Sequence, residues 1–439
     1  MLGGYQIHNP LYFWRREKAR LLHSRKVAAT ARAKTLAASA LSRVSSSTNF
    51  DDSSTPQSSD DPSPLRAFCV ALPKCELHAH IGGCVRARTL LKLLDTGGLV
   101  EEAAAARALL SAPLTLASAF AYFKCVHAAV RTAAALSLVV REAVADAAID
   151  GVVCLELRST PRALAAAPDD GLVRALPLPP AATEDDTELH RYVAVIGAAL
   201  VDAAIMYPGV TVRLLLSFDR AAPPAAHAAV ARVAAAWADV RVTGLAPMPE
   251  EPNVLVVGVD VSGDPRVGDA RELLPLLSSL RARGIKVAFH TGEIRNDDEY
   301  AAVSAWRPDR YGHMAVLSDD AVAAHCALGA NAPPIEVCPT SNALTLGLGH
   351  LRDHPTLRQW LAARVPVAIC SDDPAAFRSP LSAEFERVAV DFGLGEAELE
   401  ALALRAFDYS FVNKEEVAVE LLELRTYGRT SPPPASDAF

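Results

Sequence analysis

Residues 152–158 read Val-Val-Cys-Leu-Glu-Leu-Arg, a short and mostly apolar run, and residues 212–218 (VRLLLSF) and 365–370 (VPVAIC) resemble it. A strand that is buried on both faces, as in a parallel sheet, has this nearly continuous apolar character. Eight such runs are separated by long Ala- and Leu-rich stretches that we expect to be helical. The predicted strands are Lys74–Ala79, Val152–Arg158, Val212–Phe218, Val254–Asp260, Ile285–His290, Arg310–His313, Pro334–Cys338 and Val365–Cys370.

The alternation of strands and helices predicts an α/β fold with a parallel sheet. Eight units in about 350 residues match a (β/α)8 TIM barrel with insertions. The alternative is an open, doubly wound sheet, but no GxGxxG follows the first strand, which argues against a dinucleotide site. The Pro- and Asp-rich stretch 165–186 is interpreted as an inserted loop.

The charge distribution separates the first residues from the rest of the 439-residue chain. Residues 1–50 contain nine Lys or Arg and one Glu, whereas the remainder has 34 basic and 50 acidic residues and a net charge of −16. We interpret residues 1–64 as a basic extension, either an organellar transit peptide or a disordered segment. The predicted barrel would span 65–425, followed by a flexible tail at 426–439. An acidic body argues against nucleic-acid binding and favours a small-molecule partner.

Amino-acid composition bears on the cellular compartment in which the protein is expected. Apolar residues make up 51% of the chain and aromatic residues 6%, and no run of eighteen uncharged apolar residues predicts a membrane span. The eight cysteines form no CxxC pair, which favours buried thiols in a reducing compartment. We therefore expect a cytoplasmic monomer, with organellar targeting by the basic N-terminus as the alternative location.

Polar side chains stand at the ends of the predicted strands, where a barrel assembles its active site. His78 and His80 are two residues apart in one strand and so point to the same face. Alone they would often be a surface pair, but His290 adds a third imidazole and Asp372 a carboxylate. Three histidines, one aspartate and an open water position are typical of catalytic zinc. Because the fourth strand ends in Asp260 and lacks a bridging lysine, we predict one Zn²⁺ per chain.

Hydrolysis at a ring carbon also needs groups that move protons. His313, at the sixth strand end, is the candidate base that takes the proton of water and positions the hydroxide. Glu293 is the candidate acid for a ring nitrogen if burial raises its pKa, and Asp373 can face ring nitrogens. Taken singly, Glu293 could instead cap a helix or form a salt bridge, and Asp373 could be a turn residue before Pro374.

Several motifs resemble the adenosine/AMP deaminase family, most closely its N6-methyl-AMP deaminase-like branch. They run in family order from Leu72 to about Phe411, and ELRSTPR and SGDP distinguish this branch from the adenosine deaminases proper. The motifs are LPKCELHAH, ELRSTPR, VRLLLSFDR, GVDVSGDPRVG, AFHTGEI, RYGHM, IEVCPTSNALT and CSDDPAAF.

The resemblance implies a (β/α)8 TIM barrel of the metal-dependent hydrolase type, and roles for individual residues. The zinc ligands would be His78, His80, His290 and Asp372, and the catalytic residues Glu293, His313 and Asp372. The HxE…PCxxC signature of the unrelated cytidine-deaminase type of zinc enzyme is absent. The purine nucleotide or nucleoside would be held by His80, Gly82, His127, Ser159, Thr160, Pro161, Arg162, Asp219, Gly263 and Asp373.

Two departures bear on the substrate. The family usually has Asp or Asn at the position of Gly82, which is expected to contact the ribose, and DDPAAF reads more like the adenosine deaminases. The leading hypothesis is conversion of N6-methyl-AMP to IMP and methylamine, and the alternative is an adenosine deaminase that yields inosine and ammonia. Two further readings are a metal-dependent hydrolase of a ring amide and a catalytically inactive barrel that serves as a binding protein.

Overall fold

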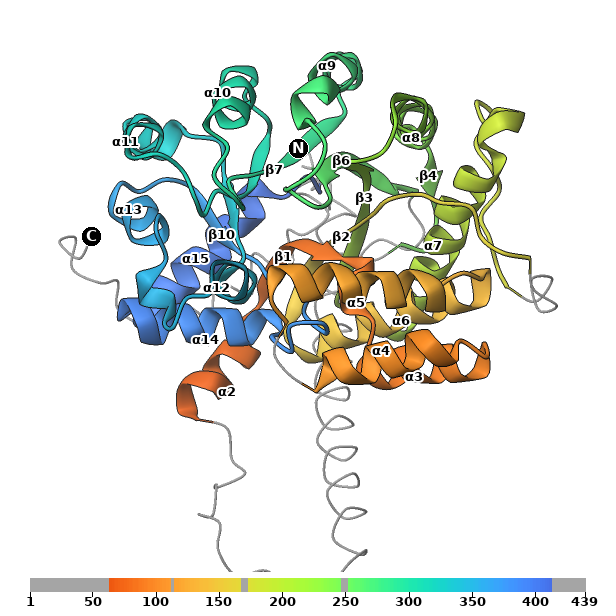
Figure 1. Cartoon of the computed structure of the whole chain (residues 1–439), viewed down its shortest axis with the longest axis horizontal. Coiled ribbons are helices and arrows are strands. Elements are labelled where there is room, and N and C mark those ends of the chain that lie inside the picture. The colour runs from red at the N-terminus through yellow and green to blue at the C-terminus, as the bar shows by residue number, and fades with distance from the viewer. Residues whose placement is uncertain (1–62, 112–113, 167–172, 246–251, 413–439) are drawn as a thin grey trace, which may run out of the picture. The chain divides into compact units, whose positions relative to one another are not determined.

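The computed structural model describes residues 63–111, 114–166, 173–245 and 252–412. Nearly all of the predicted N-terminal extension and the whole predicted tail lie outside these ranges, so both remain predictions. Within the described ranges, eight parallel strands form one sheet in the order β1-β2-β3-β6-β7-β8-β9-β10 (Figure 1). They are β1 (Lys74–His80), β2 (Val152–Ser159), β3 (Thr211–Asp219), β6 (Val256–Ser262), β7 (Lys286–Thr291), β8 (Arg310–His313), β9 (Ile335–Val337) and β10 (Val367–Ile369).

The last strand returns to the first, so the sheet closes into a barrel. Ala79 forms a parallel bridge with Asp372, where the chain leaves β10, and the amide N of Asp372 donates to the carbonyl O of His78 at 2.8 Å. The predicted (β/α)8 barrel is therefore confirmed. One boundary was wrong, because Asn253–Val254 (β5) pairs antiparallel with Arg241–Val242 (β4), and the barrel strand starts only at Val256.

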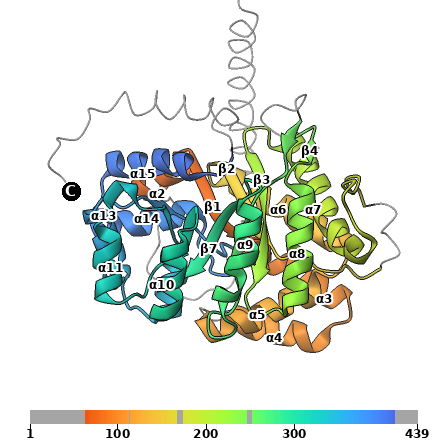
Figure 2. The same ribbon diagram turned by 90° about the horizontal axis from the view of Figure 1, so that it is seen from above.

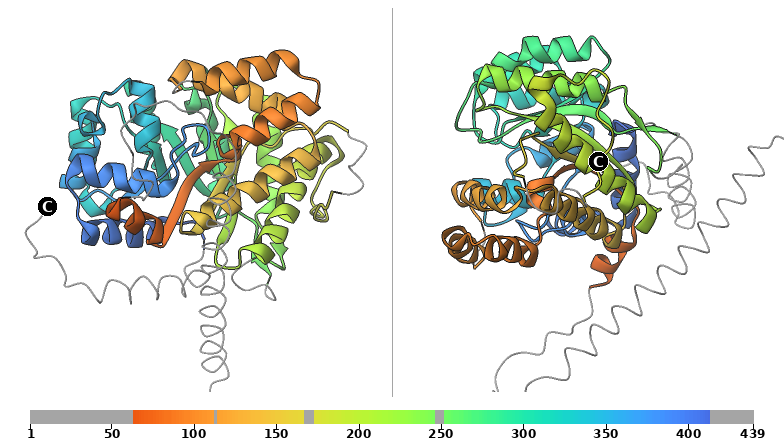
Figure 3. Two further views of the ribbon diagram at one scale, coloured as in Figure 1. Left: turned by 90° about the horizontal axis from the view of Figure 1, so that it is seen from below. Right: turned by 90° about the vertical axis from the view of Figure 1, so that its right-hand side faces the viewer.

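Helices surround the strands on the outside (Figure 2). The connection from β1 to β2 is the longest, since it holds three helices before the crossover helix α6, and these three lie together on one side of the barrel (Figure 3). The helices are α2 (Pro64–Ala71), α3 (Ala87–Thr96), α4 (Val100–Leu110), α5 (Leu116–Ala129), α6 (Ala133–Ile149), α7 (Thr187–Met206), α8 (Pro224–Trp237), α9 (Leu274–Arg281), α10 (Asp297–Trp306), α11 (Asp319–Cys326), α12 (Pro339–Leu346), α13 (Leu357–Ala362), α14 (Leu381–Phe392) and α15 (Glu396–Tyr409).

Local sequence explains the start of α5, a helix that lines the site described below. The side chain of Thr115 accepts from the backbone N of Ser118, and Ser118 Oγ accepts from the backbone N of Thr115 at 2.7 Å. This reciprocal capping satisfies two backbone donors that a helix start would otherwise leave free. Between β2 and α7, the described residues 161–166 and 173–183 contain neither helix nor strand, as expected for an inserted loop.

Among the described helices, the stretch Glu184–Met206, which includes all of α7, is long and apolar enough to cross a membrane by length and composition. However, 72% of its most apolar window is buried inside the protein, where α7 packs on α6. We interpret it as a core helix of the barrel, which needs an apolar surface because the sheet and the neighbouring helices cover it.

Two consecutive glycines follow β1, and only one of them is required by packing. A Cβ added at Gly83 would lie 1.8 Å from Oδ1 and 2.4 Å from Cβ of Asp373, whereas a Cβ at Gly82 would meet only Val126 Cγ1, at 3.9 Å. Neither glycine has a positive φ. Gly83 therefore lets the segment after β10 approach β1, and Gly82 leaves open space.

We predict that Gly83→Ala destabilises the fold and Gly82→Ala does not. Overpacking of this kind costs about 1–3 kcal/mol of unfolding free energy, and urea denaturation of the two variants measures the difference directly. Equal stability of the two variants would show that Asp373 moves aside without cost.

Candidate active site

The four predicted metal ligands meet at the carboxyl ends of the strands. Nε2 of His80 lies 3.3 Å from Nε2 of His78 and 3.3 Å from Nε2 of His290. Oδ1 of Asp372 is 3.3 Å from His78 Nε2 and 3.5 Å from His80 Nε2. Nitrogen and oxygen atoms of three strand ends therefore point at one small volume, as a shared cation requires.

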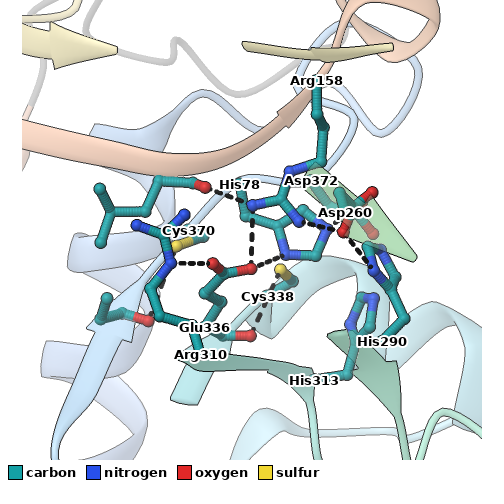
Figure 4. A network of polar contacts seen from close by, with 12 residues as sticks. His78, Arg158, Asp260, His290, Arg310, His313, Glu336, Cys338, Cys370 and Asp372 are labelled. Atoms are coloured by element: carbon teal, nitrogen blue, oxygen red, sulfur yellow. Dashed lines mark hydrogen bonds and ion pairs between the residues drawn. The ribbon is translucent and has the colours of Figure 1, made fainter. Parts of the chain in front are cut away.

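Two buried carboxylates fix which nitrogen of each imidazole is free. Glu336 Oε2 lies 2.8 Å from His78 Nδ1, and Asp260 Oδ1 lies 3.0 Å from His290 Nδ1 (Figure 4). An ionised carboxylate only accepts hydrogen bonds, so each one is placed to take the hydrogen of Nδ1, which would leave Nε2 of each ring to a metal ion. Carboxylate–histidine pairs of this kind orient the ligands in known metal sites. The donor set thus fits a metal ion.

Arg158 ties these two carboxylates together beneath the metal ligands. Its Nη1 is 2.9 Å from Asp260 Oδ1 and its Nη2 is 3.0 Å from Glu336 Oε2. Arg310 Nε binds the second oxygen of Glu336 at 2.6 Å. All these side chains are fully buried, and Figure 4 shows how they converge from different strands. The interior of the barrel is thus a paired charge network rather than a purely apolar core.

The carboxyl groups of the site differ in protonation. Burial raises the pKa of Glu293 to about 7. Burial, with Asp372 and Glu293 nearby, raises the pKa of Asp373 well above its usual range. For Asp372, burial acts upward, but the hydrogen bond from His78 and the other histidines bring its pKa well below the usual range. One ionised carboxylate therefore stands beside two groups that hold protons near neutral pH.

His313 ends β8 in a left-handed backbone conformation, with φ of 65°. Its Nε2 lies 3.8 Å from Glu293 Oε2, and its Nδ1 lies 3.0 Å from Nδ2 of Asn342. His313, Asp372 and the Cys338 thiol also form a second close group of donor atoms. His313 is thus near the ligands, but its Nδ1 contacts an amide and not a carboxylate.

A cavity of about 360 Å³ opens above these groups. This volume falls within the range of roughly 300–1,000 Å³ that is usual for small-molecule sites. Two of the predicted site residues, Pro161 and His78, are buried and do not line this cavity. The predicted residues that do line the cavity are His80, Gly82, His127, Ser159, Thr160, Arg162, Asp219, Gly263, His290, Glu293, His313, Asp372 and Asp373.

The lining of the cavity also includes a cation, Arg162. Arg162 Nη2 donates to the carbonyl O of Val130 at 3.3 Å, and its guanidinium lies 5.4 Å from the ring centre of Tyr192. Among the residues that the structure describes, no carboxylate pairs with Arg162. Tyr192 Oη also bonds Ser159 Oγ at 2.7 Å. Burial, followed by the charge of Arg162, lowers the pKa of His127 to about 4, so His127 is neutral.

Some lining residues gave no sequence signal. Phe120, Phe123 and Val126 come from α5, and Tyr192 comes from α7. An aromatic or aliphatic residue in an apolar helix usually marks a core position, so nothing in the pattern distinguished these side chains. Asn342 lies inside the CPTSNALT stretch, but no chemistry pointed to it.

Comparisons with known proteins agree over about four fifths of the chain. Residues 73–424 match the family model described as adenosine deaminase. The N6-mAMP deaminase of Arabidopsis thaliana is 29% identical over 360 residues, which cover 79% of this chain and 94% of that protein. The crystal structure of the Arabidopsis N6-mAMP deaminase is similar with a TM-score of 0.66 and 26% identity, over 83% of this chain and 100% of that chain. A structure of Arabidopsis ADAL complexed with IMP has a TM-score of 0.66 and 26% identity, covering 83% of this chain and 98% of that chain.

The converging lone pairs lead to a metal-binding prediction. We expect the unsubstituted protein to bind one divalent metal ion per chain. Because His290→Ala removes one of the four donors, we expect the amount of metal that this variant retains after dialysis to be at least tenfold lower. Elemental analysis measures this, and His350→Ala, at an exposed histidine away from the site, is the control. Full metal occupancy in His290→Ala would contradict the assignment.

Proposed function

The chain belongs to the adenosine deaminase family, and we propose on this basis that it is a zinc-dependent enzyme that hydrolytically removes the 6-amino or 6-methylamino group of an adenine nucleotide. N6-methyl-AMP, giving IMP and methylamine, is the leading substrate. The observation that carries this proposal is that members of a cation-binding cluster and the guanidinium of Arg162 line one and the same cavity. Relatives described as N6-mAMP deaminases, and the IMP bound by an Arabidopsis structure, support it.

Zinc is the metal that best suits the donor atoms. Three imidazole nitrogens and one carboxylate, with no thiolate among them, match catalytic zinc sites. When bound, zinc lowers the pKa of water to about 7 and so provides a nucleophile at neutral pH. His78, His80, His290 and Asp372 would hold it.

Glu293 is placed to carry a proton to the purine ring. Its pKa of about 7 means that both protonation states are populated near neutral pH. Addition of water to the ring carbon leaves charge on the adjacent nitrogen, and a proton from the Glu293 carboxyl neutralises it. A pKa of about 7 therefore lets Glu293 both accept and donate a proton near neutral pH.

Asp373 and Gly263 would contact the base. Asp373 Oδ1 is buried and has no hydrogen-bond partner among the described residues, and its raised pKa makes the carboxyl group a neutral donor. Such a buried polar atom is costly unless a ligand satisfies it. Gly263 has φ of +109°, and a Cβ there would lie 2.5 Å from Asp219 Oδ1. Glycine thus leaves this edge of the cavity free for a planar ring.

Arg162 would bind the phosphate of the nucleotide. Its guanidinium carries a charge that no described carboxylate pairs with, and Ser159 and Thr160 line the same cavity. The open space at Gly82 adds no ribose contact, which increases the share of binding that depends on phosphate. Adenosine deamination, the alternative, would make little use of Arg162.

We expect Glu293→Gln to keep the fold and the metal but to lower kcat by about 10²–10⁴-fold, because general acid–base catalysis contributes this much. Loss of purine absorbance on deamination measures the rate, and metal analysis on the same sample is the control. A rate within threefold of the unsubstituted enzyme would assign ring protonation to another group.

We expect Arg162→Ala to raise KM for N6-methyl-AMP by roughly ten- to a hundredfold, since hydrogen bonds between charged groups contribute about 1.5–3 kcal/mol each. Turnover of the nucleoside N6-methyladenosine, however slow, should change little. Arg174→Ala, at an exposed arginine paired with Asp202, is the matched control. Equal losses on nucleotide and nucleoside would make Arg162 structural, and a clear preference of the unsubstituted enzyme for adenosine would replace the nucleotide proposal.

A further inference from the structure

Behind His313, two buried side chains form a hydrogen-bonded chain that leads away from the cavity. Asn342, in α12, places Nδ2 3.0 Å from His313 Nδ1 and Oδ1 3.2 Å from Nε2 of His354. His313 and Asn342 are 1% exposed and His354 is 4% exposed. Every bond in this chain is therefore shielded from water, and each needs a donor facing an acceptor.

The backbone sets the direction of these bonds. Nδ1 of His354 accepts from the amide N of Thr356 at 3.3 Å and from that of Leu357 at 3.1 Å, at the start of α13. Backbone N–H groups only donate, so His354 Nδ1 must hold a lone pair. Burial, followed by the neighbouring His313, lowers the pKa of His354 to about 4. The ring is neutral, and its single hydrogen is on Nε2.

The same logic continues through the amide. His354 Nε2–H donates, so the atom of Asn342 facing it is the carbonyl oxygen, and the amino group of Asn342 faces His313. That amino group donates, so His313 Nδ1 is the acceptor. An imidazole that accepts at one nitrogen is neutral and carries a single hydrogen, on its other nitrogen. It lies on Nε2, the nitrogen 3.8 Å from Glu293 Oε2.

We propose that His354 and Asn342 are positioning residues that fix the tautomer of His313, so that His313 donates a hydrogen bond to the attacking water oxygen instead of taking its proton. This rests on the function proposed above and revises the base role predicted from the sequence. The proton then goes elsewhere: as the C–O bond forms, the O–H bond breaks, its proton passes to the Glu293 carboxylate, and Glu293 delivers it to the ring nitrogen. His313 keeps its hydrogen throughout.

Two substitutions of His354 separate the proposed role from a structural one. In His354→Asn, the amide oxygen takes the place of Nδ1 and keeps the bonds from Thr356 and Leu357, but nothing reaches Asn342. In His354→Gln, the amide nitrogen takes the place of Nε2 and still donates to Asn342, but the α13 start loses its acceptor. We expect His354→Asn to keep its Tm and lose at least tenfold in kcat with KM within threefold, and His354→Gln to lower Tm and retain most of kcat.

The opposite pattern, in which kcat falls only where Tm falls, would overturn the proposal. Long-range ¹H–¹⁵N spectra of the zinc-loaded enzyme with ¹⁵N-labelled histidine provide a readout that does not need activity. We expect His313, assigned through His313→Gln, to carry hydrogen on Nε2 in the unsubstituted enzyme and to lose this pattern in Asn342→Asp, whose carboxylate accepts from Nδ1. Hydrogen on Nδ1 in the unsubstituted enzyme would overturn the tautomer assignment. A wild-type enzyme that deaminates no adenine compound would overturn the proposed function alone.

Discussion

The buried carboxylate of Glu336 is the interaction on which the site depends. It lies 2.8 Å from His78 Nδ1, 3.0 Å from Arg158 Nη2 and 2.6 Å from Arg310 Nε. Burial alone would raise its pKa, but Arg158 and Arg310 hold the pKa of Glu336 well below its usual range. A buried carboxylate without such partners would cost several kcal/mol or take up a proton. Because Glu336 stays ionised, it can accept the hydrogen of His78 Nδ1, and Nε2 of His78 faces the other ligand atoms.

Partners, more than depth, decide the charge of each acid in the barrel. Asp260 and Glu293 are both little exposed, yet the pKa of Asp260 lies well below its usual range while that of Glu293 rises to about 7. Asp260 Oδ1 lies 3.0 Å from His290 Nδ1 and 2.9 Å from Arg158 Nη1. By contrast, the basic atom that faces Glu293 Oε2 is His313 Nε2, at the longer distance of 3.8 Å. Paired acids therefore orient the ligands from below, and the weakly paired acids at the cavity keep protons available for chemistry.

The sequence predicted the parts of the protein that strand periodicity and strand ends control. All eight barrel strands and the cluster of His78, His80, His290 and Asp372 were found in this way. What it could not predict depends on contacts between distant elements. The ring of Tyr192 lies beneath Arg162, and Asn342 lies between two histidines 29 and 12 residues away. An apolar helix position or a single amide carries no mark of such a partner, because the fold alone brings them together.

The choice between a carboxylate and an amide behind a histidine separates two uses of the same side chain in one cavity. Glu336 and Asp260 accept hydrogen from Nδ1, which leaves a lone pair on Nε2 that can bind a cation. Asn342 donates to Nδ1 of His313, which leaves a hydrogen on Nε2, and an N–H group cannot ligate a metal. His313 therefore lies close to Asp372 and Cys338 without adding a fourth imidazole to the cluster. A carboxylate at position 342 would remove this distinction, since Nε2 of His313 would then present a lone pair, as the Nε2 atoms of the metal-binding cluster would.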